Sequence, residues 1–209
     1  MRREARRTLF SLTRQYQTAI NIADYEVIAL DSGSSEPLDP DWVKSLQPNI
    51  RYRYVDTCWP TPCKAMNIGI RMSRADNLVL MVDGARILSP GILNKMLMAQ
   101  KLYKTPFTYT ISMHLGHMRQ NKALLEGYDQ QEEDALLAST CWQADGYQLF
   151  DISCLSGSAV DGFLHPITES GCFSVSKNTL LHLGGYSEKF RTPGGGLVSS
   201  DLFNRIQML

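Results

Sequence analysis

Two stretches of sequence decide the fold: residues 25–35, YEVIALDSGSS, and residues 77–83, NLVLMVD. Each is an apolar run that ends in an aspartate, Asp31 in the first and Asp83 in the second. The second run is continuous, and burial of both faces in this way is typical of a strand inside a parallel sheet. Both stretches are therefore expected to be buried strands, and each places a carboxylate at the carboxyl end of its strand.

Helical patterns alternate with strand patterns outward from these two stretches. Further strands are expected at residues 50–55, 107–113 and 172–175. Helices are expected at residues 5–20, 40–46, 64–73, 89–103, 130–140, 177–183 and from 199 onward. Strands that alternate with helices form right-handed crossovers, so the sequence predicts an α/β fold with a doubly wound, mainly parallel sheet flanked by helices.

Composition excludes some classes of protein. The 209 residues include 21 basic and 21 acidic side chains, whereas nucleic-acid binding normally leaves a basic surplus. No apolar run approaches the roughly 20 residues that span a bilayer, so no membrane span is expected in this chain. No Gly-x-Gly-x-x-Gly follows a candidate strand, which argues against a dinucleotide-dependent dehydrogenase.

The five cysteines help to predict the cellular compartment. They are scattered, odd in number and without metal-type spacing: Cys58, Cys63, Cys141, Cys154 and Cys172. A disulfide framework is typical of a much smaller secreted chain. Reduced thiols and a cytoplasmic location are therefore expected.

Four motifs occur in one order along the chain: residues 25–35, 65–70 (AMNIGI), 77–83 and 183–190 (LGGYSEKF). The ordered set resembles the family 2 glycosyltransferases of the GT-A fold, over nearly the whole chain. The resemblance implies an inverting enzyme of carbohydrate biosynthesis that moves a sugar from a nucleotide-diphosphate donor to a hydroxyl of a glycan, lipid or small molecule. It also implies one domain, residues 1–209, with a nucleotide-binding half (1–113) and an acceptor-side half (114–209).

The resemblance assigns roles to the nucleotide-binding residues. Asp31 matches the acid that recognises the nucleobase, and Gly33 lies in the turn behind it. Asn67 and Gly69 match the Asn-x-Gly of the helix beneath the nucleotide. Asp83 matches the first acid of an Asp-x-Asp motif, which contacts the ribose and a divalent cation, Mn²⁺ or Mg²⁺.

Two positions depart from the family pattern. Ala85 stands where the second acid of Asp-x-Asp is expected, which puts the metal site in question. No acid precedes the helix that begins near Asp201 at the position of the usual general base. Inverting transfer needs a carboxylate that accepts the proton of the acceptor hydroxyl, and Glu169 or Asp201 is the candidate. The alternative is a catalytically weak or inactive domain that binds a nucleotide sugar or a partner.

Four more residues are candidates for substrate contact. Arg86 and Arg205 can offset diphosphate charge through bidentate contacts. His114 can steady the diphosphate, and Gly195, in a run of three glycines, can let the backbone approach the ligand. Each also has an ordinary structural interpretation as a surface residue, a helix cap or a packed loop residue.

The family also begins with a central strand, whereas this chain begins on the helix that follows it. We therefore expect the strands at 25–30 and 77–82 to lack a shared neighbour, as in a fragment or a chain whose true start lies upstream. Direct pairing of these two strands would contradict that expectation.

Overall fold

The computed structural model describes residues 2–82, 85–193 and 196–209, and it confirms the α/β prediction. The strands are β1 (Val27–Ser32), β2 (Ile50–Val55), β3 (Asn77–Met81), β4 (Thr108–Tyr109), β5 (Met113–Leu115), β6 (Ser153–Leu155) and β7 (Cys172–Ser176). The α-helices are α1 (Arg2–Ser11), α2 (Pro40–Leu46), α3 (Cys63–Met72), α4 (Ile92–Leu102), α5 (Gln120–Leu125), α6 (Gln130–Ala138), α7 (Lys177–His182) and α8 (Val198–Gln207). In these ranges no helix is long and apolar enough to cross a membrane.

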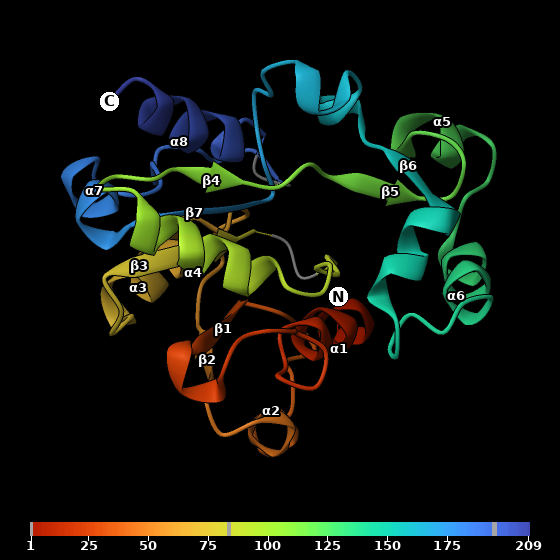
Figure 1. The fold of residues 1–209 in the computed structure, drawn as a ribbon, viewed down its shortest axis with the longest axis horizontal. Helices are drawn as coiled ribbons and strands as arrows, with labels where there is room; N and C mark the ends of the chain where they lie inside the picture. The colour runs from red at the N-terminus through yellow and green to blue at the C-terminus, as the bar shows by residue number, and fades with distance from the viewer. Residues whose placement is uncertain (1, 83–84, 194–195) are drawn as a thin grey trace.

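The strands form three separate groups (Figure 1). β1 and β2 pair in parallel, with Val27 opposite Ile50. β7 runs antiparallel between β3 and β4, and β5 pairs antiparallel with β6. The chain therefore combines one parallel pair, joined through α2, with antiparallel pairs that form among β3 and the strands that follow it.

α1 is shorter than the helix expected over residues 5–20. It ends at Ser11, and the chain then turns back through irregular backbone. The side chain of Gln17 is fully buried and donates to the carbonyl oxygens of Ser11 and Ser89 at 2.8 and 3.2 Å. This amide joins the carbonyl group at the end of α1 to that of Ser89, and Ala19 has a positive φ of 56°, which a continuing helix excludes.

The strand expected at residues 107–113 is divided in two. β4 ends at Tyr109, and the hydroxyl of Ser170 donates to the carbonyl oxygen of Thr110 at 2.8 Å. The chain then leaves β7 and resumes as β5, which pairs with β6. β6 and α5 were not expected from the sequence, because both are short and neither carries a clear hydrophobic period.

Two helical layers cover the strands. On one side, Ile70 of α3 packs with Leu78 and Leu80 of β3, and with α7 and α8. On the other side, Leu93 and Met96 of α4 pack against Ile20, Leu88 and the side chain of Met81. Leu12, just past α1, packs both with that cluster and with the cluster around β1 and α2. The same layers therefore extend over both β1 and β3.

β1 and β3 do not pair with each other in spite of these shared layers. A cavity of about 510 Å³ lies between them, and its walls include β1 over its whole length and β3 over its whole length. We call this cavity the strand slot. The structure thus agrees with the expectation that the two strands lack a shared neighbour.

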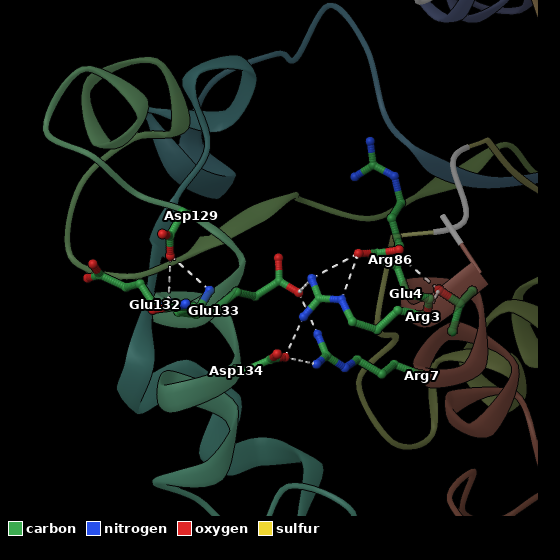
Figure 2. Close-up of polar contacts among 10 residues, drawn as sticks. Arg3, Glu4, Arg7, Arg86, Asp129, Glu132, Glu133 and Asp134 are labelled. Atoms are coloured by element: carbon green, nitrogen blue, oxygen red, sulfur yellow. Dashed lines mark hydrogen bonds and ion pairs between the residues drawn. The ribbon is translucent and has the colours of Figure 1, made fainter.

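A network of charged side chains joins α1 to α6 (Figure 2). Arg3 donates to Glu133 at 3.1 Å and also to Asp134, and Arg7 pairs with the same two carboxylates. Arginines on one helix that share a carboxylate pair on another fix both helices through several charge-assisted bonds. The acidic start of α6 is therefore a contact surface for α1.

Candidate functional site

Asp31 lies at the carboxyl end of β1, where its carboxylate is held from two sides. Its Oδ1 accepts a hydrogen bond from the backbone N–H of Ser34 at 3.0 Å, and its Oδ2 accepts one from the hydroxyl of Tyr52 at 3.0 Å. Burial and this bond to Asp31 raise the pKa of Tyr52 to about 12. A carboxylate oxygen can accept more than one hydrogen bond. Asp31 is therefore oriented by the protein and keeps lone pairs for a ligand.

Gly33 brings the loop after β2 against the turn after β1. Its φ is +69°, and a Cβ at this position would collide with the carbonyl oxygen of Thr57, so only glycine fits. In the same loop, the ring of Trp59 carries the guanidinium of Arg191, whose Cζ is 3.3 Å from the ring centroid. These contacts build a fixed rim beside Asp31.

Arg86 adds a positive charge just beyond β3. Its Nε donates to the carbonyl oxygen of Val82 at 3.1 Å, and its Nη1 donates to the hydroxyl of Ser112 at 3.4 Å. Figure 2 shows its guanidinium directed away from the carboxylates of Glu133 and Asp134. Within the described ranges no carboxylate forms an ion pair with Arg86. A guanidinium can bind a phosphate group through bidentate contacts, which makes Arg86 a candidate ligand of the diphosphate.

Glu169 lies two residues before Gly171, which packs against Arg86. A Cβ at Gly171 would collide with the guanidinium of Arg86, so the segment before β7 packs directly on that group. The Oε2 of Glu169 accepts a hydrogen bond from the hydroxyl of Ser200 at 2.9 Å, at the start of α8. The structure therefore brings a candidate general base within two residues of the Arg86 contact.

Asn67 and Gly69 make their contacts with other groups of the protein. The Nδ2 of Asn67 donates to the carbonyl oxygen of Tyr186 and to Glu188, both at 2.9 Å, and its Oδ1 accepts from the backbone N–H of Tyr186 at 2.8 Å. A Cβ at Gly69 would lie 2.5 Å from Leu30 Cδ1, so glycine lets α3 approach β1. Both residues shape the site from beneath, and the amide of Asn67 is fully used by the chain itself.

Asp201 and Arg205 bind each other on α8. The Oδ2 of Asp201 accepts from Nε and Nη2 of Arg205 at 3.0 and 2.6 Å. The guanidinium also donates to the carbonyl oxygens of Leu183 and Gly185, both at 2.9 Å. This pair holds the turn after α7, so its groups are less available to a substrate than those of Glu169 and Arg86.

His114 lies in β5, which is well separated from β1 in Figure 1. Its ring packs on Tyr128 with 4.9 Å between centroids, and its buried Nε2 has no hydrogen-bond partner among the described residues. Burial lowers the pKa of His114, against the opposing effect of the Glu133 carboxylate. A cavity of about 220 Å³ adjoins Tyr128 and is lined also by His117, Glu126 and Glu132. The structure does not bring His114 together with Asp31.

Two predicted site residues, Asp83 and Gly195, lie outside the described residues. Ala85 is exposed and offers no ligand atom on its side chain. Within the described ranges no group of three His, Cys, Asp or Glu side chains is placed to hold a metal ion. The described residues therefore do not form a metal site.

Sequence reasoning missed two contributors to the site. Tyr52 was assigned only to a strand, although the alternation of Tyr and Arg over residues 51–54 places its ring on one face of that strand. The contact of Trp59 with Arg191 joins loops more than a hundred residues apart in sequence, and no local sequence pattern predicts it.

The placement of Asp31 at a strand end agrees with the result of comparing the sequence with known protein families. The family model described as Glycosyl transferase family 2 matches residues 3–153, which is more than half of the chain. No curated protein matches the chain as a relative. The matched region contains Asp31, Asn67 and Arg86, and it ends before Glu169.

Replacement of Asn67 by alanine is expected to lower the free energy of unfolding by about 2–4 kcal/mol, since it leaves both backbone groups of Tyr186 unpaired at a buried site. Urea unfolding measures the change. Asn178→Ala, at an exposed position of α7, is the matched control and is expected to stay close to wild type. Equal stability of the two variants would contradict the bracing role of Asn67.

Stability is expected to depend on pH through His114. Its pKa in the folded state lies below its ordinary value of about 6.5. The unfolded chain therefore binds the proton first as pH falls, and stability that is fully present above that value is lost below it. His114→Phe should reduce this loss when unfolding is measured from pH 7.5 to 5. The exposed His165→Gln control should retain it; an unchanged pH profile in His114→Phe would refute the assignment.

Proposed function

Because the chain belongs to glycosyl transferase family 2, we propose that it transfers a sugar, with inversion, from a nucleotide-diphosphate sugar to a hydroxyl acceptor. The observation that carries this proposal is the oriented carboxylate of Asp31 at the carboxyl end of β1. In open α/β sheets the carboxyl ends of the strands are where ligands bind. The acceptor belongs to the glycans, lipids or small molecules, and a role in carbohydrate biosynthesis follows from the reaction.

The donor would lie along this edge of the strands. Asp31 accepts hydrogen bonds from the nucleobase, beside the rim formed by Gly33 and the loop after β2. Asp83 contacts the ribose. Arg86 faces the diphosphate, where its guanidinium offsets negative charge.

A divalent cation is a separate part of the proposal. Asp83 is the candidate ligand, and Ala85 supplies none. Because the described residues do not complete a ligand set for Mn²⁺ or Mg²⁺, we derive no step through a cation. If one binds, it would supply further neutralisation of the diphosphate.

Glu169 is the proposed general base. Its carboxylate takes the proton of the acceptor hydroxyl while the hydroxyl oxygen forms a bond to the anomeric carbon of the sugar. The bond from that carbon to the diphosphate breaks on the opposite face, and the diphosphate leaves with the electron pair toward Arg86. The packing of Gly171 on Arg86 supports this arrangement, because Glu169 lies two residues from that contact along the chain.

A cytoplasmic location is also proposed. All five cysteines are free thiols: Cys58, Cys63, Cys141, Cys154 and Cys172. Free thiols, two of them exposed and two buried, are usual in a reducing compartment.

At least one nucleoside diphosphate from a panel of the five common bases is expected to bind in calorimetric titration. Asp31→Asn should weaken that binding about 10–100-fold, since a hydrogen bond to a charged group contributes about 1.5–3 kcal/mol. Asp41→Asn removes a carboxylate that is 92% exposed and should leave affinity unchanged. Titrations with and without Mn²⁺, repeated on Asp83→Ala, report on the cation. Failure of every nucleotide to bind folded protein would refute the proposed donor site.

Glu169→Gln is expected to lower kcat by about 10²–10⁴-fold while the donor Kd stays near wild type, because a general base acts on the chemical step. Asp201→Asn is the comparison: it breaks the contact with Arg205 and should reduce stability more than kcat. Loss of turnover in Asp201→Asn alone would transfer the role of base to Asp201. Donor binding without turnover in the wild type would favour a binding module.

A further inference from the structure

We propose that the side chains of Tyr147 and Phe150 form a platform on which one sugar ring of the acceptor stacks, and that the acceptor is a neutral glycan of several sugar units. We call these two side chains the aromatic platform. The inference deepens the proposed function and rests on it, because it narrows the acceptor from glycans, lipids or small molecules to one of these classes.

The aromatic platform belongs to η2 (Gly146–Ile152), a 3₁₀ helix between α6 and β6 (Figure 1). Side chains three residues apart lie on the same face of a 3₁₀ helix. Leu149 and Ile152, one such pair, pack into a buried cluster. Tyr147 and Phe150, also three apart, stay 52% and 47% exposed. One apolar pair of η2 therefore serves the core, and the other meets the solvent.

The two rings present nearly parallel faces. Their planes lie 17° apart, with 6.3 Å between their centroids. The hydroxyl of Tyr147 donates to the carbonyl oxygen of Pro90 at 2.9 Å, which holds that ring in place. A Cβ at Gly146 would collide with the side chains of Tyr16 and Pro90, so glycine lets η2 lie close against them. A ligand that stacks on a ring already held in this way costs less side-chain entropy on binding.

A sugar ring suits such a platform because of its C–H groups. The face of an aromatic ring carries negative charge density from its quadrupole. The C–H hydrogens on one face of a pyranose carry partial positive charge and are attracted to that ring face. The hydroxyls at the edge of the sugar meanwhile keep their hydrogen bonds with water. Stacking therefore buries apolar surface without leaving a polar group unpaired.

The charges around the aromatic platform disfavour an anionic ligand. Residues 123–176 contain no lysine or arginine, and the exposed Asp145 and Asp151 flank the two rings along the chain. Carboxylates repel phosphate groups, which argues against a nucleotide or an anionic lipid surface at this place. A carboxylate accepts hydrogen bonds from hydroxyl groups. A neutral glycan therefore fits both the rings and their surroundings.

Two hydrogen bonds connect the platform segment with the surroundings of Arg86. Tyr147 binds Pro90, which follows Arg86 by four residues. Just after β6, the backbone N–H of Ser156 donates to the carbonyl oxygen of Ser112 at 3.0 Å. The hydroxyl of Ser112 accepts the bond from Arg86 at 3.4 Å. We therefore expect the terminal hydroxyl of the acceptor to lie at the candidate site and a more internal sugar to lie on the platform.

The test is calorimetric titration of the whole chain, without a donor, with four neutral linear hexasaccharides. These are the β-1,4-linked hexamers of glucose, N-acetylglucosamine and mannose, and the α-1,4-linked hexamer of glucose. At least one is expected to bind. The matching monosaccharide should bind at least about tenfold more weakly, because one ring cannot meet the platform and the candidate site together. A galacturonate hexamer should also bind more weakly than the neutral hexamer, because the carboxylates repel it.

Variants of the platform separate ring stacking from general apolar contact. Phe150→Ala removes one ring and should weaken binding of the hexasaccharide about tenfold. Phe150→Leu keeps an apolar side chain without a ring and should weaken binding nearly as much. Tyr147→Phe keeps the ring and should bind more tightly than Tyr147→Ala. The matched control is Phe163→Ala, which removes an 89% exposed ring outside the platform and should bind as the wild type does. Urea unfolding of each variant checks that it is folded.

Several results would overturn the inference. Failure of all four hexasaccharides to bind the folded protein would do so, as would an affinity that Phe150→Ala leaves unchanged. Equal binding by Phe150→Leu and the wild type would show general apolar contact. A change of oligomeric state in Phe150→Ala with unchanged glycan affinity would show a protein interface instead.

The inference and the proposed function can fail separately. No donor is present in the glycan titrations, so failure of every nucleotide to bind, with hexasaccharide binding intact, would overturn the proposed transfer and leave a glycan-binding platform. Donor binding without any hexasaccharide binding would overturn the platform alone. Loss of nucleoside diphosphate affinity in Phe150→Ala would assign these rings to the donor and contradict the inference.

Discussion

Backbone hydrogen bonding at β1 and β3 is the constraint on which the rest of the structure depends. Both strands lie between the same helical layers, yet among the described residues each pairs with another strand along one edge alone. The helical layers that pack on both strands therefore hold the two groups of strands together.

The candidate site is built from residues of both groups of strands. Asp31 and Gly33 belong to the β1–β2 side, whereas Arg86, Gly171 and Glu169 belong to the side of β3 and β7. The donor site and the acceptor-side acid are thus assembled by tertiary packing between segments far apart in sequence. Contacts such as Asn67 with Tyr186 matter for the same reason, since they fix α3 beneath β1 and brace the turn after α7.

Much of the first half could be predicted from sequence because its signals are local. The apolar runs that end at Asp31 and Asp83, and the Asp39–Pro40 cap of α2, mark their elements directly. The early end of α1 could not be predicted, because the buried side chain of Gln17 bonds to Ser89 and Leu93, which are distant in sequence, as well as to Ser11. Among the site residues, the sequence placed Asp31 at its strand end but could not show that Asp201 is bound to Arg205, or that Arg86 contacts the carbonyl oxygen of Val82.

The most direct test of the central claim is an amide chemical-shift map of a bound nucleoside diphosphate. The account predicts shifts concentrated at residues 31–36, in the loop at 56–62 after β2, and around Arg86 and Gly171. Shifts concentrated instead at Gly116, His117 and Tyr128, beside the smaller cavity, would contradict it. So would a folded protein whose amides do not respond to any nucleotide.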